Sequence, residues 1–246
     1  DQERLVDFLD CETQRIDDAS ALLEGLEGLL AERFAGQIED MLAPKPGSQR
    51  MRIDWVCDVL REQVSLEEIQ QLDEVVLYSV DGVAATGSPV KTRGSEIESA
   101  KLRVHGGELL VSRLNPRRGH VTTTSTHDQF TLCSGEWVVL RPRSGFALEY
   151  LYFLFSSDST RQRLDSLVRS VTKSHGRVDP SEVTKMWATI PSAEVQLEIS
   201  ETLSRADRQR AEVSSLLEQQ RQLLAERRRA LVSAAVTGQL DVEAVA

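Results

Sequence analysis

The two ends of this chain repeat each other, and this repeat limits the possible folds more than any other feature. Residues 20–33 (SALLEGLEGLLAER) and 214–227 (SSLLEQQRQLLAER) are identical at 9 of 14 positions, at a constant offset of 194 residues. Such self-similarity indicates two copies of one structural unit that bury their apolar faces against each other. The chain therefore has to be explained as a middle segment held between two related ends.

Both copies carry apolar residues at a spacing of seven, which is typical of a coiled coil. The expected seam consists of Leu9, Ile16, Leu23 and Leu30 in the first copy and Leu203, Leu217, Leu224 and Leu231 in the second. A second line of the seam is expected at Leu5, Ala19, Leu26, Ala206 and Val213, with polar interruptions at Glu12, Arg33, Arg210, Gln220 and Arg227. A helix of about 40 residues, roughly 60 Å long, cannot bury such a stripe alone. We therefore expect the two helices to pack as an antiparallel coiled coil.

The segment between the repeats has the pattern of a separate domain. A cluster of helix breakers at 42–48 (LAPKPGS) ends the first helix. Short apolar runs then predict strands at 75–80, 108–112, 120–124, 130–133, 136–140 and 187–190, and helices at 147–155, 159–168 and 179–186. The expected fold class is α+β, with one mixed α/β domain at 43–190 between long helices at 1–42 and 191–246.

Charge is distributed unevenly along the chain. The net charge is −10 overall, but residues 1–42 carry −9 and residues 91–190 carry +5. A positive surface able to contact phosphate is therefore expected in the middle domain alone. Charges scattered over an ordinary surface are the alternative interpretation.

Two basic loops concentrate the residues that can bind nucleic acid. They are 112–120 (SRLNPRRGH) and 170–178 (SVTKSHGRV), and 88–94 (SPVKTRG) is a weaker third. Arginine can bind guanine through two hydrogen bonds and asparagine can do the same for adenine, whereas small hydroxyl residues beside a glycine suit a phosphate. The expected DNA contacts are Lys91, Arg93, Arg113, Asn115, Arg117, Arg118, His120, Thr172, Lys173, Ser174, His175 and Arg177. Solvated turns are the alternative, and Arg141 and Arg143 are expected to be ordinary surface residues.

Motifs for catalysis on this chain are missing from the sequence. It contains no GxGxxG, no phosphate-binding P-loop, no GxSxG and no metal-ligand spacing among its four histidines. No run of 18 apolar residues predicts a membrane span, and three scattered cysteines without a CxxC favour a reducing compartment. We expect a cytoplasmic protein without a catalytic or metal site and without a membrane partner.

Four segments resemble the DNA specificity (S) subunit of type I restriction–modification enzymes, and together they extend over essentially the whole chain. Residues 1–17 (DQERLVDFLDCETQRID) look like the opening of that family's spacer helix, and 109–116 (LLVSRLNP) look like its strand-and-loop motif. Residues 178–191 (VDPSEVTKMWATIP) look like the exit from a target-recognition domain. Residues 227–241 (RRRALVSAAVTGQLD) look like the family's helix end, with Gly238 as the stop signal.

The resemblance implies a non-catalytic bacterial subunit that reads double-stranded DNA between two spacer helices. Its implied partners are methyltransferase (M) subunits and, further, a restriction (R) subunit. S-adenosylmethionine would be bound by the M subunit, ATP and Mg by the R subunit, and no cofactor by this chain. Complete members usually carry two recognition domains, so one domain implies a half-length subunit or a C-terminal portion. The start at Asp1 without methionine favours a portion.

Two other functions stay open from the sequence. One is a coiled-coil scaffold whose middle domain binds protein, and the other is an S-like subunit of a different phage-defence methylation system. DNA binding weakens steeply with salt, so salt dependence distinguishes a DNA-binding subunit from a protein-binding scaffold. The partners that co-purify with the chain distinguish a type I S subunit from an S-like subunit of another methylation system.

Overall fold

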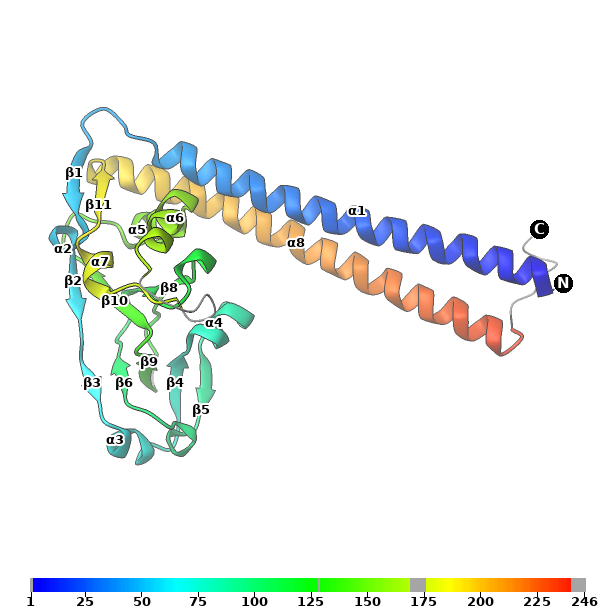
Figure 1. Cartoon of the computed structure of the whole chain (residues 1–246), viewed down its shortest axis with the longest axis horizontal. Helices are drawn as coiled ribbons and strands as arrows, with labels where there is room; N and C mark the ends of the chain where they lie inside the picture. The colour runs from blue at the N-terminus through cyan, green and yellow to red at the C-terminus, as the bar shows by residue number, and fades with distance from the viewer. Residues whose placement is uncertain (1, 128, 169–175, 240–246) are drawn as a thin grey trace. The chain divides into compact units, whose positions relative to one another are not determined.

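A computed structural model describes residues 2–127, 129–168 and 176–239 (Figure 1). The chain divides into two compact units. The first unit consists of the residues up to Gly36 together with those from Arg205 onward, and we call it the rod. The second unit consists of residues 37–204, and we call it the globular unit.

The rod is made by the outer parts of the two long helices, α1 (Gln2–Leu42) and α8 (Ala193–Val236). They run side by side in opposite directions (Figure 1). Arg228 pairs with Asp17 at 3.4 Å and Arg221 with Glu27 at 3.6 Å, so residue numbers fall along α8 as they rise along α1. The structure therefore confirms the expected antiparallel coiled coil.

The C-terminal end of α8 follows the expected stop signal. Gly238 has a left-handed φ of 67°, and the Gln239 N–H donates to the Ala234 carbonyl at 2.9 Å. A left-handed glycine after the last turn lets the chain satisfy carbonyls that the helix leaves open. This is the physical reason that α8 ends at Val236.

The seam of the rod is narrow. Among the expected seam residues, Ile16 is buried, and the half-buried ones are Leu9, Leu23, Leu30, Leu217, Leu224 and Leu231. Leu203 is also buried, but it belongs to the globular unit. The second line differs from the expectation, because Leu26 is 49% exposed and Val213 is 40% exposed. Two helices can cover only a narrow apolar stripe on each other, which leaves part of the second line open to solvent.

Three polar interruptions of the seam, Glu12, Arg210 and Arg227, make contacts across the two helices. Arg227 binds the Glu12 carboxylate at 2.7 Å, and only 9% of Glu12 is exposed. The Arg210 guanidinium lies 5.2 Å from the centre of the Phe34 ring, within cation–π distance. Polar seam residues that pair with one partner favour a single register, so these contacts fix the register of α1 against α8.

The described residues of the globular unit form three sheets. A small antiparallel ribbon joins its two ends through β1 (Gln49–Arg52) and β11 (Trp187–Ile190). An antiparallel sheet has the order β2 (Cys57–Leu60), β10 (Trp137–Pro142), β7 (Leu109–Ser112) and β8 (Val121–Thr123). A mixed sheet has the order β3 (Gln63–Val64), β6 (Lys101–Arg103), β9 (Phe130–Cys133), β4 (Val75–Tyr78) and β5 (Val90–Thr92), with β4 and β9 parallel.

Short helices connect these strands. They are α2 (Ile53–Val56), α3 (Leu66–Gln70), α4 (Val80–Thr86), α5 (Leu148–Ser156), α6 (Asp158–Ser166), α7 (Pro180–Thr184) and the 3-10 turns η1 (Gly94–Glu96) and η2 (Pro116–Arg118). Each predicted strand and helix is present with slightly shifted ends. One end differs for a clear reason: Ser79 accepts a hydrogen bond from the Gly82 N–H, and this cap starts α4 where the strand was expected to continue.

An apolar core joins strands from the two larger sheets. Val76 and Tyr78 of β4 pack with Leu110 of β7 and with Trp137 and Val139 of β10. The Trp137 indole N–H donates to the Tyr78 carbonyl at 2.9 Å, so the one polar atom of this ring is satisfied. The core therefore anchors the end of β7 and the start of β10, where the first basic loop leaves the sheet.

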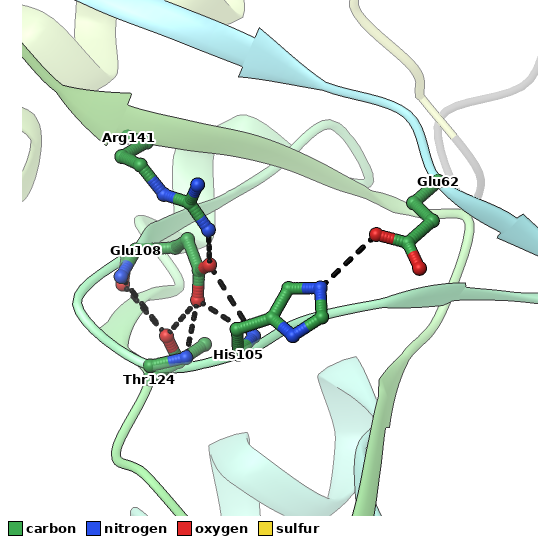
Figure 2. A network of polar contacts seen from close by, with 6 residues as sticks. Glu62, His105, Glu108, Thr124 and Arg141 are labelled. Atoms are coloured by element: carbon green, nitrogen blue, oxygen red, sulfur yellow. Dashed lines mark hydrogen bonds and ion pairs between the residues drawn. The ribbon is translucent and has the colours of Figure 1, made fainter.

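A buried carboxylate lies at the other end of β7 (Figure 2). The Glu108 side chain is fully buried and accepts hydrogen bonds from Thr124 Oγ1 at 2.5 Å, Arg141 Nη2 at 2.6 Å and the Gly106 N–H at 2.7 Å. Burial by itself raises the pKa of Glu108, but these hydrogen bonds together lower it below its ordinary value. Arg141 was expected to be an ordinary surface residue, and this expectation was wrong, because its guanidinium binds the buried Glu108 carboxylate.

Candidate nucleic-acid interface

The first basic loop contacts residues 176–178, the described end of the second basic loop. After β7 the Arg113 N–H donates to the Glu136 carbonyl, and the Arg113 carbonyl accepts from the Val178 N–H, both at 2.9 Å. The Asn115 N–H donates to the Gly176 carbonyl at 2.7 Å. Residues 113–120 and 176–178 thus form one hydrogen-bonded surface, which we call the loop pair.

The first loop folds into a tight turn for local reasons. Asn115 adopts a left-handed φ of 47°, which asparagine tolerates better than most residues, and Pro116 then begins η2. Gly119 also has a left-handed φ, of 64°, and a Cβ there would lie 3.0 Å from Cδ of Arg161 in α6. Arg117 and Arg118 are exposed on this turn.

Arg177 is held by a carboxylate that the sequence did not single out. Its Nε and Nη2 bind Glu136, with distances of 3.1 and 2.8 Å to Oε1. The hydrogen bonds to Glu136, and then its charge, raise the pKa of Arg177. A two-bond grip of this kind fixes the plane of the guanidinium as well as its position.

Arg113 and His120 have different electrostatic environments. Arg113 is half-buried, and its Nε atom is inaccessible and lacks a hydrogen-bond partner. An unsatisfied buried donor is unfavourable, and such a group in a folded protein needs an explanation, for example a functional role or a bound water or ion. The pKa of His120 is lowered mainly by burial and further by Arg118, against the opposing effect of Asp81, and this lowering favours the neutral imidazole. The positive charge of the first loop therefore comes from its arginines.

Two further predicted contacts, Lys91 and Arg93, are not part of the loop pair. Lys91 lies in β5, 3.8 Å from Glu74, and the exposed Arg93 precedes η1. Within the described part of the chain, no hydrogen bond or ion pair connects either residue to the loop pair. Thr172, Lys173, Ser174 and His175 lie outside the described residues.

Sequence reasoning missed two residues that shape this surface. Glu136 belongs to a short Ser-Gly-Glu turn and lies 41 positions from Arg177, so no local pattern connects them. Arg161 was predicted only as part of a helix, and its contact with Gly119 depends on the tertiary fold. Long-range pairing of this kind carries no signal in the spacing of residues.

The described residues contain neither a candidate metal site nor a candidate membrane-spanning helix. No group of three or more potential metal ligands occurs among them. None of the helices they form is both long and apolar enough to cross a membrane.

The rod carries an exposed apolar surface of its own. Leu22 and Leu29 of α1 are 71% and 62% exposed, and Leu216 and Leu223 of α8 are 55% and 57% exposed. All four directly precede a seam leucine, and such equivalent positions lie side by side in an antiparallel pair. We call these four residues the leucine face. Exposed apolar patches of this kind are typical of interaction sites.

An α+β domain inserted between two long antiparallel helices defines the architectural class. Three solved structures share it. A chain from a study of "complex assembly and conformational transition of the type I R-M system" matches with a TM-score of 0.74 and 14% identity, over 95% of this chain and 58% of that one. The HsdS subunit from Thermoanaerobacter tengcongensis matches with a TM-score of 0.57 and 15% identity, over 97% and 58% of the two chains. The type I S subunit from M. genitalium matches with a TM-score of 0.50 and 11% identity, over 95% and 60%.

The chain therefore has the fold of type I S subunits, and the expected resemblance is confirmed at the level of fold. It spans 58 to 60% of the length of these three chains. No protein-family model matches the sequence. No curated protein sequence matches it either.

Proposed function

We propose that this chain is the DNA-recognition part of a type I restriction–modification complex, as a half-length S subunit or a portion of a longer one. The globular unit reads one half of a split DNA target. The rod holds it at a set distance from a second recognition domain, because paired helices act as a spacer. The chain itself is non-catalytic in this proposal.

The loop pair is the observation that best supports DNA recognition. The first basic loop is hydrogen-bonded to residues 176–178, with Arg117 and Arg118 exposed and Arg113 carrying an unsatisfied donor. Exposed arginines provide affinity through phosphate contacts, whereas Arg113 and Asn115 are the residues suited to base edges. We keep Lys173 as a further base-reading residue and Lys91 and Arg93 as weaker phosphate contacts.

Methyltransferase subunits are the proposed partners of the rod, with a restriction subunit as a further component. The leucine face gives them an apolar surface, and the acidic α1 keeps the rod away from DNA. S-adenosylmethionine would be bound by the methyltransferase, which must reach an adenine extruded from the duplex. ATP and Mg would belong to the restriction subunit.

The test is a DNA titration of the chain assembled with the methyltransferase subunits of its own host. Arg113→Ala should weaken binding of the cognate duplex by about 1–3 kcal/mol, because a base or phosphate contact is lost. Affinity of the wild-type complex should also fall steeply between low and moderate salt.

Arg143→Ala is the matched control, since Arg143 is a half-exposed arginine that pairs with Asp58 at 2.9 Å. Its binding curve should overlay that of the wild type. Equal binding by the Arg113 and Arg143 variants would show that the loop pair does not read DNA. Binding that is insensitive to salt would favour a protein-interaction scaffold.

A further inference from the structure

The ion pair between Arg177 and Glu136 places a carboxylate within a surface that is otherwise suited to phosphate. Glu136 keeps 28% of its side chain exposed, and Arg177 keeps 46%. A negative charge beside a polyanion weakens binding, so this residue lowers the affinity that the arginines provide. If Glu136 contributes to function, it therefore does so by something other than an increase in DNA affinity.

The geometry indicates what that benefit is. The segment that carries Arg113 runs between the Glu136 turn and residues 176–178, with a backbone hydrogen bond to each side. Leu114 faces Arg177 as a bridge partner. The Arg177–Glu136 pair therefore spans the segment that bears the base-reading residues and connects its two neighbours.

We propose that Glu136 is a positioning residue for sequence reading, an inference that rests on the proposed function. It holds Arg177 through two nitrogens, and this grip fixes the segment with Arg113 and Asn115 in one geometry. Specificity is the difference between the affinity for the target sequence and the affinity for other sequences. A side chain that prevents an arginine from binding phosphate on every sequence lowers the second affinity and so increases that difference. Glu136 thus lowers binding to all sequences while it sharpens the choice among them.

Glu136→Gln tests this directly, because glutamine keeps the shape of the side chain and removes its charge. The assembled complex with methyltransferase subunits first selects duplexes from a random-sequence library. Binding is then compared between a selected duplex and a scrambled duplex of the same length. The variant should bind the scrambled duplex about 3-fold more tightly, with a salt slope steeper by roughly one, since one more cation contacts phosphate. Its preference for the selected duplex should fall about 10-fold.

Asp58→Asn is the matched control. It also removes a carboxylate from a half-exposed arginine, here Arg143, and makes the same change in net charge. This control should change neither the preference nor the slope. An additional Arg177→Gln change in the Glu136→Gln variant should abolish the gain on the scrambled duplex without restoring the preference.

Each outcome separates this inference from the proposed function. A wild-type complex that selects no sequence contradicts the proposed function itself. A wild-type complex that selects a sequence, with an unchanged preference in Glu136→Gln, overturns only the positioning role.

If Glu136→Gln melts at a lower temperature, Arg177→Lys replaces it as the test, because lysine keeps the charge and cannot make the two-bond grip. An unchanged preference in Arg177→Lys then overturns the inference, and a reduced preference supports it.

Discussion

The rod and the globular unit reach a defined structure by different means. In the rod, a repeat of seven residues sets the helices and a few cross-helix pairs, such as Glu12 with Arg227, set the register. In the globular unit, strands of two to six residues depend on partners far away in the sequence, as β1 depends on β11. The structure of the rod is therefore determined by local sequence pattern, and much of its surface is open to solvent. The structure of the globular unit is determined by the burial of residues that are distant in sequence.

This difference affects what each part can do. The rod leaves apolar side chains exposed along its length, so substitutions there can remove a partner without unfolding the chain. The globular unit buries charged groups such as Glu108, so substitutions there change stability first. The following substitutions test this contrast, from the largest expected effect to the smallest.

The largest effect is expected at the leucine face. Leu22→Lys together with Leu29→Lys should abolish co-purification of the methyltransferase subunits, because charged side chains replace the apolar contact. Helix content by circular dichroism should not change, since both leucines are mostly exposed. Ala21→Lys with Gly28→Lys is the control, with the same two charges at the same spacing on exposed positions of α1. Equal capture of the partner by both double variants would exclude the leucine face as the docking site.

A large loss of stability is expected at Glu108. Glu108→Gln places an amide where the buried carboxylate accepts hydrogen bonds from Gly106 and Arg141, and it should cost about 3 kcal/mol. All three tryptophans of the chain, Trp55, Trp137 and Trp187, belong to the globular unit, so urea unfolding followed by tryptophan fluorescence reports on this unit alone. Glu74→Gln, at a side chain that is 51% exposed, should stay within about 0.5 kcal/mol of the wild type.

The effect of Glu108 should also depend on pH. Its pKa is lower in the folded state than its ordinary value, so the ionised group stabilises the fold at neutral pH. This contribution is lost as the pH falls through the folded-state pKa. The difference in stability between wild type and Glu108→Gln should therefore shrink in acid. A difference that stays constant from neutral to acidic pH would show that the carboxylate charge is not the cause.

The sequence alone predicted the parts of the structure that depend on local pattern. The seam spacing predicted two antiparallel helices, and Gly238 predicted the end of α8. The short, mainly apolar runs at 108–112 and 130–133 predicted strands, and β7 and β9 form there with largely buried residues. The strands β1, β2, β3, β5 and β6 were missed. Segments such as QRMR and KLR have no apolar alternation and become strands only through pairing.

In the candidate site, too, the sequence predicted the local features and missed the long-range contacts. Arginine and asparagine in a turn identified the first loop, and Gly176 and Arg177 identified part of the second. Their contact, and the role of Glu136 between them, depends on backbone pairing across more than 40 positions of sequence. Residue type therefore predicted which side chains are suited to bind DNA, and only tertiary structure revealed which of them are restrained.

The smallest effect is expected in the rod, at the pair between Glu12 and Arg227. A double-mutant cycle with both residues changed to alanine should give a coupling of about 1 kcal/mol, because the Glu12 carboxylate is mostly shielded from water. Thermal unfolding followed by circular dichroism measures it, since the rod is helical throughout its described part. The same cycle on Asp17 and Arg228, whose side chains are 55% and 51% exposed, should give a coupling close to zero. Equal couplings for the two pairs would mean that burial in the seam does not strengthen the contact. The register would then depend on the leucines alone, and the rod would be specified by its apolar repeat without help from its polar residues.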